Sequence, residues 1–253
     1  MDALPVEAQA GRQTTGWFQP GVNQPARALA VYPCLLNVLH SRLTGPEDGF
    51  GQKWEKIYYL RLPAGRLTPE GVIAHWKERF SSLWPRGSHF FTPATGIRTG
   101  EIALLKLSFP GRYTPFVATG VYINHADSTR FTYTALSGHP IAGSLTFTAF
   151  REDGDLIVQA HAVLRASDPL YEIAFRLAGE REDLFWLQTL ENLAASMGVP
   201  GHFSKEINLL DPGLRWRNAR NLLHNAAIRS AIYQLTFPMR LLRLYWIGKR
   251  YSR

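Results

Sequence analysis

His139 is the residue of this chain whose type and position best suit chemistry. It stands between Gly138 and Pro140 in a predicted connection between two strands, where an imidazole could bind a ligand or move a proton near neutral pH. The alternative, which we favour, is a turn residue whose ring nitrogen bonds to the backbone. His161 falls on the polar side of a predicted strand, and we expect it to be merely exposed.

Other catalytic and metal-binding patterns are missing from the sequence. No pair of His, Asp or Glu has the helical spacing of a metal site, and Cys34 is the only cysteine. There is no Gly-x-Ser-x-Gly motif for a serine nucleophile and no glycine-rich phosphate loop. We therefore expect no metal and no cofactor, and the sequence assigns no catalytic residue.

Aromatic residues are the second candidate for a site, because several are predicted to gather between a sheet and a helix. They are Tyr58, Trp76, Phe80, Tyr122, Phe131, Tyr133 and Phe147. Such residues either fill a core or line an apolar pocket with a few hydroxyl groups for orientation. Periodicity does not distinguish a lined pocket from a filled core, so both readings stay open at this point.

The elements that must position these residues can be predicted from apolar spacing and turn signals. Strands are expected at 54–62, 102–109, 116–124, 129–136, 144–150 and 156–164. Thr68-Pro69-Glu70 is a typical helix start, and apolar residues at three- and four-residue spacing predict a helix up to Pro85. A longer helical pattern covers 169–197, with a break expected at Gly179.

The predicted sheet is antiparallel and has one apolar face. Its strands follow one another through short connections, such as 152–155, and neighbours joined in this way run antiparallel. Alternation groups Phe131 with Tyr133 and Leu145 with Phe147 on the apolar face. The sequence therefore predicts the α+β class.

The order strand, helix, several antiparallel strands, long helix resembles the helix-grip arrangement of the START-like, or SRPBCC, superfamily. Residues 133–143, with the sequence YTALSGHPIAG, and Phe147 after them are similar to the segment G-T-L-x-G-H-x-x-x-G-E-x-x-F of an uncharacterised bacterial and plant family in that superfamily. Thr134 and Ala135 replace the Gly-Thr of that segment, and Ser144 replaces its Glu. The resemblance spans roughly 100–200 and implies a curved sheet of about six or seven strands around a long C-terminal helix.

The charge of the chain is concentrated at its end. The net charge is +8, yet nine Lys or Arg residues follow Asp211, which is the last acidic residue, so the part before it is close to neutral. Apolar and aromatic residues lie between these cations in a roughly helical pattern, which suits an anionic membrane surface. Nucleic acid is a less suitable partner because dense Lys/Arg clusters are missing. The candidate contacts are Arg215, Arg217, Arg220, Arg229, Arg240 and Arg243.

Two packing states of this basic tail remain open: a membrane-bound helix, or helices packed on the domain with a solvated basic face. The predicted organisation is an N-terminal extension at 1–50, a helix-grip domain at 51–200 and a helical basic tail at 201–253. The first residues show no secretory signal, and one cysteine excludes an internal disulfide. We expect the protein in the cytosol, either free or at a membrane surface.

These observations lead to one functional hypothesis and one alternative. The resemblance implies a hollow between sheet and long helix, so we predict a non-enzymatic carrier or sensor of a hydrophobic or amphipathic small molecule. Tyr58, Tyr122, Tyr133 and Phe147 would be the pocket walls, with His139 as a polar contact at the rim. The alternative is an enzyme of cyclase, dehydratase or hydrolase type that uses the same pocket, since the superfamily hosts such activities. His139 beside a buried carboxylate such as Glu101 or Glu172 would favour the enzyme.

Overall fold

The computed structural model describes residues 34–39, 41–63, 65–108, 117–178, 180–236 and 239. Within these residues, eight strands form one antiparallel sheet in the order β2-β3-β4-β5-β6-β7-β1-β8. The strands are β1 (Lys53–Leu62), β2 (His89–Phe91), β3 (Ile102–Leu107), β4 (Val117–Ala126), β5 (Arg130–Ala135), β6 (Ile141–Glu152), β7 (Asp155–Ala166) and β8 (His202–Asp211).

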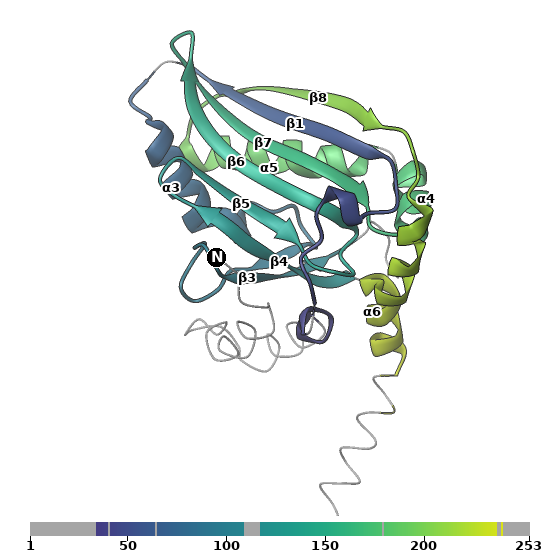
Figure 1. Cartoon of the computed structure of the whole chain (residues 1–253). Helices are drawn as coiled ribbons and strands as arrows, with labels where there is room; N and C mark the ends of the chain where they lie inside the picture. Colours follow the sequence, from purple (N-terminus) through teal and green to yellow (C-terminus); the bar gives the residue numbers. More distant parts are fainter. Residues whose placement is uncertain are drawn as a thin grey trace, which may run out of the picture.

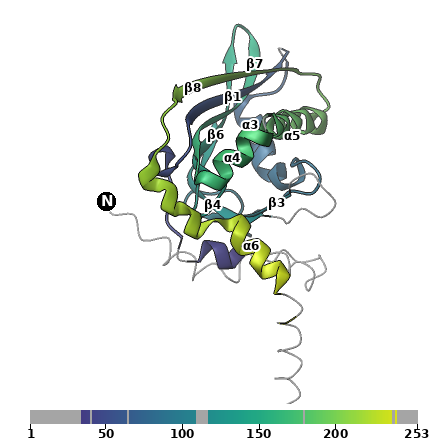
Figure 2. The same cartoon turned by 90° about the vertical axis from the view of Figure 1, so that its right-hand side faces the viewer.

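Helices lie against both faces and at one side of this sheet. They are α3 (Pro69–Arg79), α4 (Pro169–Ala178), α5 (Arg181–Met197) and α6 (Ala226–Leu235), with the 3-10 helices η1 (Pro46–Asp48), η2 (Phe80–Ser82) and η3 (Trp216–His224). The sheet curves around α3 and α5, while α4, η3 and α6 lie at the side where the long strands end (Figures 1 and 2). The chain therefore has the predicted α+β helix-grip fold.

Local sequence explains the helices that grip the core. Thr68 accepts a hydrogen bond from the backbone N–H of Gly71 and begins α3, with Pro69 as its first residue. The predicted long helix is two helices, as the expected break implied. In α4, the Asp168 carboxylate accepts from the backbone N–H groups of Leu170 and Tyr171, and α5 ends at Gly198 in the left-handed conformation.

The predicted apolar face of the sheet is confirmed. Phe131, Tyr133, Leu145 and Phe147 are all buried in the main core cluster, and the intervening Thr132 is only half-buried. α3 contributes Trp76 to the same cluster, η2 contributes Phe80, and α5 contributes Trp186 and Leu190. A smaller cluster lies on the other face of the sheet, around Cys34, Val38 and Leu104.

The sheet has two strands that the sequence pattern did not predict. β2 is a short edge strand of three residues. β8 occupies residues that the prediction assigned to a helical tail, and it pairs antiparallel with β1 through partners such as Lys56 and Ile207. Because β8 is an edge strand with most of its residues exposed, it lacks the strict alternation that marks a half-covered strand. The sheet is therefore larger than the six or seven strands expected.

The segment after β8 packs on the domain through asparagine side chains. Asn218 Nδ2 donates to the backbone oxygen of Gly49 over 2.8 Å, and Asn221 Nδ2 donates to that of Ser167 over 2.9 Å. The buried Asn225 donates to the Asp168 carboxylate over 2.7 Å, and its own Oδ1 accepts from the Ile228 N–H at the start of α6. Within the described residues, η3 and α6 are thus packed on the domain.

Candidate functional site

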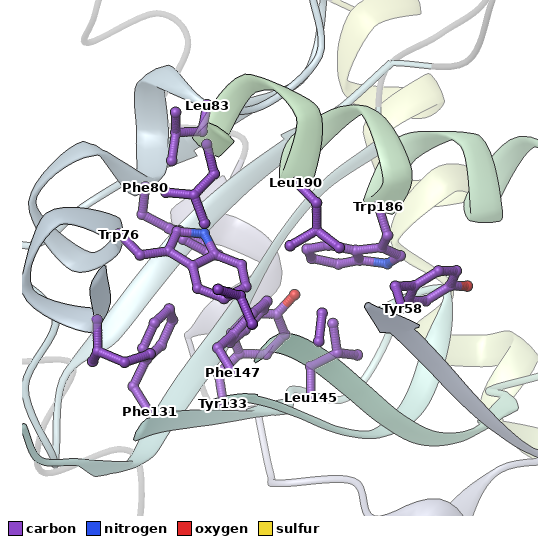
Figure 3. Close-up of a cluster of buried hydrophobic side chains, with 14 of the residues drawn as sticks. Tyr58, Trp76, Phe80, Leu83, Phe131, Tyr133, Leu145, Phe147, Trp186 and Leu190 are labelled. Carbon is purple, nitrogen blue, oxygen red and sulfur yellow. The ribbon is translucent and has the colours of Figure 1, made fainter. Parts of the chain in front are cut away.

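The space between the sheet and the helices α3 and α5 is filled by aromatic rings. Phe131 and Phe147 stack with ring centroids 4.5 Å apart, and Trp76 meets Phe147 edge-on at 5.0 Å. Trp186 comes from α5 and lies 5.6 Å from Phe147 (Figure 3). Such contacts are those of a packed interior, in which each ring stabilises its neighbours through dispersion and favourable edge-to-face geometry.

The residues predicted as pocket walls occupy three different environments. Tyr133 and Phe147 are buried in this aromatic core, and Tyr58 is buried beside it with its hydroxyl group donating to Asp183 Oδ1 over 2.8 Å. Tyr122 packs against the smaller cluster on the opposite face of the sheet, because its neighbours Val121 and Ile123 take the core side of β4. The structure therefore does not bring Tyr122 together with the other three.

His139 is a buried turn residue between β5 and β6. Its Nδ1 lies 3.1 Å from the backbone nitrogen and 3.2 Å from the backbone oxygen of Ile141, so the ring bonds to the backbone of its own turn. Burial lowers the pKa of His139 to about 4, against a smaller opposing effect of the Ile141 backbone. Among the described contacts of its ring there is neither Glu101 nor Glu172. The geometry matches the turn-residue alternative.

A groove of about 280 Å³ lies at one end of the sheet, between the start of β1, the later half of β8 and the two helices that follow β7. We call it the α4–α5 groove. It is lined by Gln52, Trp54, Lys56, Leu164, Ala166, Glu172, Phe175, Arg176, Glu182, Asp183 and Ile207. None of the residues predicted as pocket walls lines it, although the Tyr58 hydroxyl group bonds to one of its carboxylates.

Strand register explains why this groove forms. Trp54 and Lys56 are two apart on β1 and face the helices, where Trp54 is paired with Leu164 of β7 and Lys56 with Ile207 of β8. The residues of this half of β1 are only partly buried. From Tyr58 onward, every second residue of β1 is fully buried beneath the aromatic core. The helices α4 and α5 therefore cover the first half of the strand incompletely and leave a concave surface.

Charged residues form a fixed polar edge on the α5 side of the α4–α5 groove. Lys56 Nζ lies 2.8 Å from Glu182 Oε2 and 3.2 Å from Asp183 Oδ1, and Lys205 Nζ lies 2.9 Å from Asp183 Oδ2. Burial acts to raise the pKa of Asp183, but the bonds from Lys205, Tyr58 and Lys56 outweigh it and leave that pKa below its usual range. Burial likewise opposes the charge of Lys56, yet its two carboxylate partners raise its pKa.

The α4 side of the groove combines a second ion pair with apolar surface. The Glu172 carboxylate is buried and accepts from Arg176, which is one turn further along α4, over 2.9 Å. Phe175 lies between these two in the sequence and packs partly against the core. Together with Trp54, Leu164 and Ile207 it makes the groove apolar between two charged edges.

Sequence reasoning missed the α4–α5 groove, although signals for it were present. Lys56 stands at an inward-facing position of a strand that is otherwise aromatic and aliphatic, which is unusual for a lysine unless it has a partner. Glu172, Phe175 and Arg176 share one face of α4 through three- and four-residue spacing. What the sequence did not indicate is the pairing of β1 with β8, which completes one wall.

The arginines predicted to contact an anionic partner lie in several settings. Arg215 forms an ion pair with Glu47 and donates to the Glu47 backbone oxygen over 3.2 Å. Arg217 and Arg220 are exposed on η3, and Arg229 is exposed on α6, where it lies 3.2 Å from His224 Nδ1. The other two predicted contacts, Arg240 and Arg243, lie outside the described residues.

Metal clusters and membrane-spanning helices are both missing from the described residues. Within this part of the chain, no group of three or more His, Cys, Asp or Glu residues is placed to hold a metal ion. Among its helices, none is long and apolar enough to cross a membrane.

Comparison with known proteins finds likeness in three dimensions only. No family model and no curated protein sequence matches the chain. A conserved protein from Geobacillus kaustophilus aligns with a TM-score of 0.43 and 9% identity, over 59% of this chain and 98% of that one. Ginseng major latex-like protein 151 from Panax ginseng aligns with a TM-score of 0.37 and 13% identity, over 58% and 98%. The di-domain ARO/CYC StfQ of the steffimycin biosynthetic pathway aligns with a TM-score of 0.42 and 10% identity, over 61% and 54%.

Proposed function

We propose that this protein binds a small amphipathic molecule in the α4–α5 groove, as a non-enzymatic carrier or sensor. The observation that carries the proposal is the combination of a concave apolar surface with charged groups that are already held in place before a ligand arrives. Small-molecule sites are typically concave, largely apolar and supplied with a few oriented polar groups. The volume of about 280 Å³ suits a ligand at the small end of that class.

The lining indicates how such a ligand would lie. Its apolar part would rest on Trp54, Phe175 and Ile207, where burial of each additional methylene stabilises the complex by about 0.8 kcal/mol. Its polar part would meet the donors Lys56 and Arg176 or the carboxylates beside them. Because these groups already form ion pairs, a ligand gains most when it bonds to them without breaking those pairs.

Three ionisable groups at the α5 edge of the groove are poorly suited to acid–base catalysis at neutral pH. A general acid or base works best with a pKa close to the operating pH. Here the pKa of Asp183 lies below its usual range, while the pKa values of Lys56 and Tyr58 are raised above theirs, Tyr58 mainly by burial and by the nearby carboxylates. All three therefore move away from neutrality, so the enzyme alternative has no acid or base among them.

Fluorescence titration with an apolar anionic probe, anilinonaphthalene sulfonate, tests the groove directly. Phe175→Ala should weaken probe binding by about tenfold, because it removes one apolar wall. Its free energy of unfolding should fall by less than that of Phe147→Ala, since Phe175 is only half-buried. Phe147→Ala should cost about 3 to 5 kcal/mol of stability, because it opens a cavity in the aromatic core, and should leave probe affinity within about twofold of the parent.

The contrast between the two variants decides the location of the site. Probe affinity that survives Phe175→Ala and falls with Phe147→Ala would move the site into the aromatic core and contradict the proposal. Native mass spectrometry of gently purified protein is the complementary measurement. We expect a bound small molecule in the parent and a reduced bound fraction in Phe175→Ala.

A further inference from the structure

The helix α6 has an apolar stripe that nothing in the described structure covers. Ala226 and Ser230 face the domain and are buried, whereas Ile228, Ile232 and Leu235 face away from it. The last of these has 80% of its surface exposed. The spacing of four and then three residues places all three on one side of the helix. An amphipathic helix normally buries its apolar side, and α6 instead has apolar residues on the side turned away from the domain.

The neighbouring elements extend this surface. On α4, Leu170, Ile173 and Leu177 recur at three- and four-residue spacing and are exposed, Leu177 to 83%. On η3, Leu223 is exposed to 78%. Figures 1 and 2 place α4, η3 and α6 on the same side of the molecule. We call the exposed apolar side chains of these three elements the α4–α6 face, and large apolar side chains exposed together on one side of a protein mark an interaction site.

The two helices are held in a fixed relation, so the face is a preformed surface. The Asp168 carboxylate caps the start of α4 and accepts from Asn225, which in turn caps the start of α6. The Tyr171 hydroxyl oxygen accepts from the backbone N–H of Ala227 over 3.0 Å. These bonds lock the N-terminal ends of α4 and α6 together.

The exposed charges on η3 and α6 have one sign. Arg217 and Arg220 on η3 are exposed, and neither forms an ion pair within the part of the chain that the structure describes. Arg229 is exposed on α6 itself. No acidic residue follows Asp211 in the sequence, and the carboxylates of α4 and its cap, Glu172 and Asp168, are buried and bonded to Arg176 and Asn225. The exposed charges of η3 and α6 are therefore cationic, and the exposed carboxylates lie at the margins of the face, at Glu180 after α4 and at Glu47, which pairs with Arg215.

We propose that the α4–α6 face docks on an anionic lipid bilayer, with the apolar side chains of α4, η3 and α6 inserted at the level of the headgroups and the arginines against lipid phosphates. Exposed leucine and isoleucine beside arginine without an acidic partner is the composition of surface-bound helices. A second copy of the chain suits the face less well, since a symmetric contact would bring the arginines of both copies together. The proposal is independent of the α4–α5 groove.

Co-sedimentation of the full-length chain with vesicles tests the contribution of the arginine charges and that of the apolar side chains. The parent should bind vesicles of phosphatidylcholine with 30% phosphatidylserine and should bind vesicles of phosphatidylcholine alone only weakly. Rising salt should weaken the binding to the vesicles that contain phosphatidylserine. Arg217→Gln with Arg220→Gln should lower the affinity by about tenfold at low salt, and by less at high salt. Ile232→Gln with Leu235→Gln should lower it by about tenfold at either salt concentration, because this change removes apolar contact.

Matched controls come from the far side of the molecule. Arg79 and Arg86 are exposed near α3 and β2, so Arg79→Gln with Arg86→Gln removes the same charge and should leave binding unchanged. Thermal unfolding of each variant establishes that it is folded. If both double arginine variants lose the same vesicle affinity, the effect is due to net charge alone, and the proposal of a docking face is wrong. Failure of the parent to bind either vesicle, or a parent dimer in sedimentation velocity that Ile232→Gln with Leu235→Gln converts to monomer, would overturn the proposal as well.

Discussion

At the scale of single residues, a buried imidazole has a consequence for stability. His139 is enclosed between the β5–β6 turn and the elements around it, and its pKa falls to about 4 because burial disfavours the charged ring. In the unfolded chain an ordinary histidine takes up a proton near pH 6.5. Between these two pH values the unfolded state therefore binds a proton that the folded state does not.

The sign of the effect follows from this difference in proton uptake. The contribution of neutral His139 is fully present above pH 6.5 and is lost progressively as the pH falls towards 4, up to about 3 kcal/mol. His139→Gln should remove this part of the pH dependence, because an amide does not titrate there. Urea unfolding at several pH values between 4 and 7.5 gives the difference in slope between parent and variant.

The control for His139→Gln is a substitution of a solvent-exposed histidine. His202→Gln changes an exposed side chain on β8 and should leave the slope of stability against pH as in the parent. An equal slope in the parent and in His139→Gln would mean that the ring takes up its proton at the same pH in the folded and the unfolded chain, contrary to its burial.

The alternation of side chains between the two faces of a strand decides which aromatic residues were assigned to the correct face of the sheet. Tyr133 and Phe147 are separated by even steps from other apolar residues of their strands, and both lie in the core as the alternation predicts. Tyr122 stands between Val121 and Ile123, two β-branched residues that occupy the core side. Alternation along β4 therefore places Tyr122 on the opposite face of the sheet. It was predicted as a pocket wall only because it is aromatic.

At the scale of elements, the β5–β6 turn is a contact point for the C-terminal segment. The backbone oxygen of Gly138 accepts from the N–H of Ala226, over 3.0 Å, where α6 begins. Gly138 has a φ of +89°, and a Cβ added to it would lie 2.3 Å from the backbone oxygen of His224. The turn that carries the candidate His139 is therefore where two distant segments of backbone meet.

Gly138→Ala should therefore lower the free energy of unfolding by more than the backbone strain that a positive φ causes on its own. A positive φ alone costs a residue with a side chain about 1 kcal/mol, and displacement of the His224 backbone should raise the total to at least about 2 kcal/mol. Gly154→Ala is the control, because it has a φ of +88° in the β6–β7 turn but open space around the added atom. Chemical denaturation compares the two, and equal losses would contradict the close packing of this turn.

The success of element prediction depended on what covers each element. β5, β6 and β7 have one face in the core and one half-exposed, so their alternation was visible in the sequence. β8 has only one strand beside it and is mostly exposed, so its pattern resembles that of a loop or a polar helix. The α4–α5 groove needs β8 as a wall, which is why the predicted site and the groove differ.

At the scale of the whole molecule, short connections determine most of the strand order in the sheet. Strands β3 to β7 follow one another in sequence and in space, as hairpin connections require. The closing pairs β1 with β7 and β1 with β8 join residues about a hundred positions apart or more, and local patterns carry no information on such contacts. The same limit applies to the packing of η3 and α6 on the domain, which rests on asparagine bonds to distant backbone atoms.

This packing predicts the result of removing residues 214–253. The buried Asp168 would lose its bond from Asn225, and the Ser230 hydroxyl group, which accepts from the Ala118 N–H over 3.1 Å and from Asn37 Nδ2 over 3.3 Å, would be gone. Each buried polar group left without a partner costs roughly 1 to 3 kcal/mol. The truncated chain should therefore lose about 3 to 6 kcal/mol, measured by urea unfolding followed by circular dichroism.

The control for the truncation keeps the segment and changes only its exposed surface. Leu223→Ala on η3 replaces a side chain that is 78% exposed, so it should shift the unfolding free energy by less than about 0.5 kcal/mol. If the truncated chain unfolds at the same urea concentration as the parent, the asparagine bonds contribute nothing to stability. The C-terminal segment would then be an independent module resting on the domain, and its exposed apolar residues and arginines would have to be explained without the fixed geometry that α4 and α6 share.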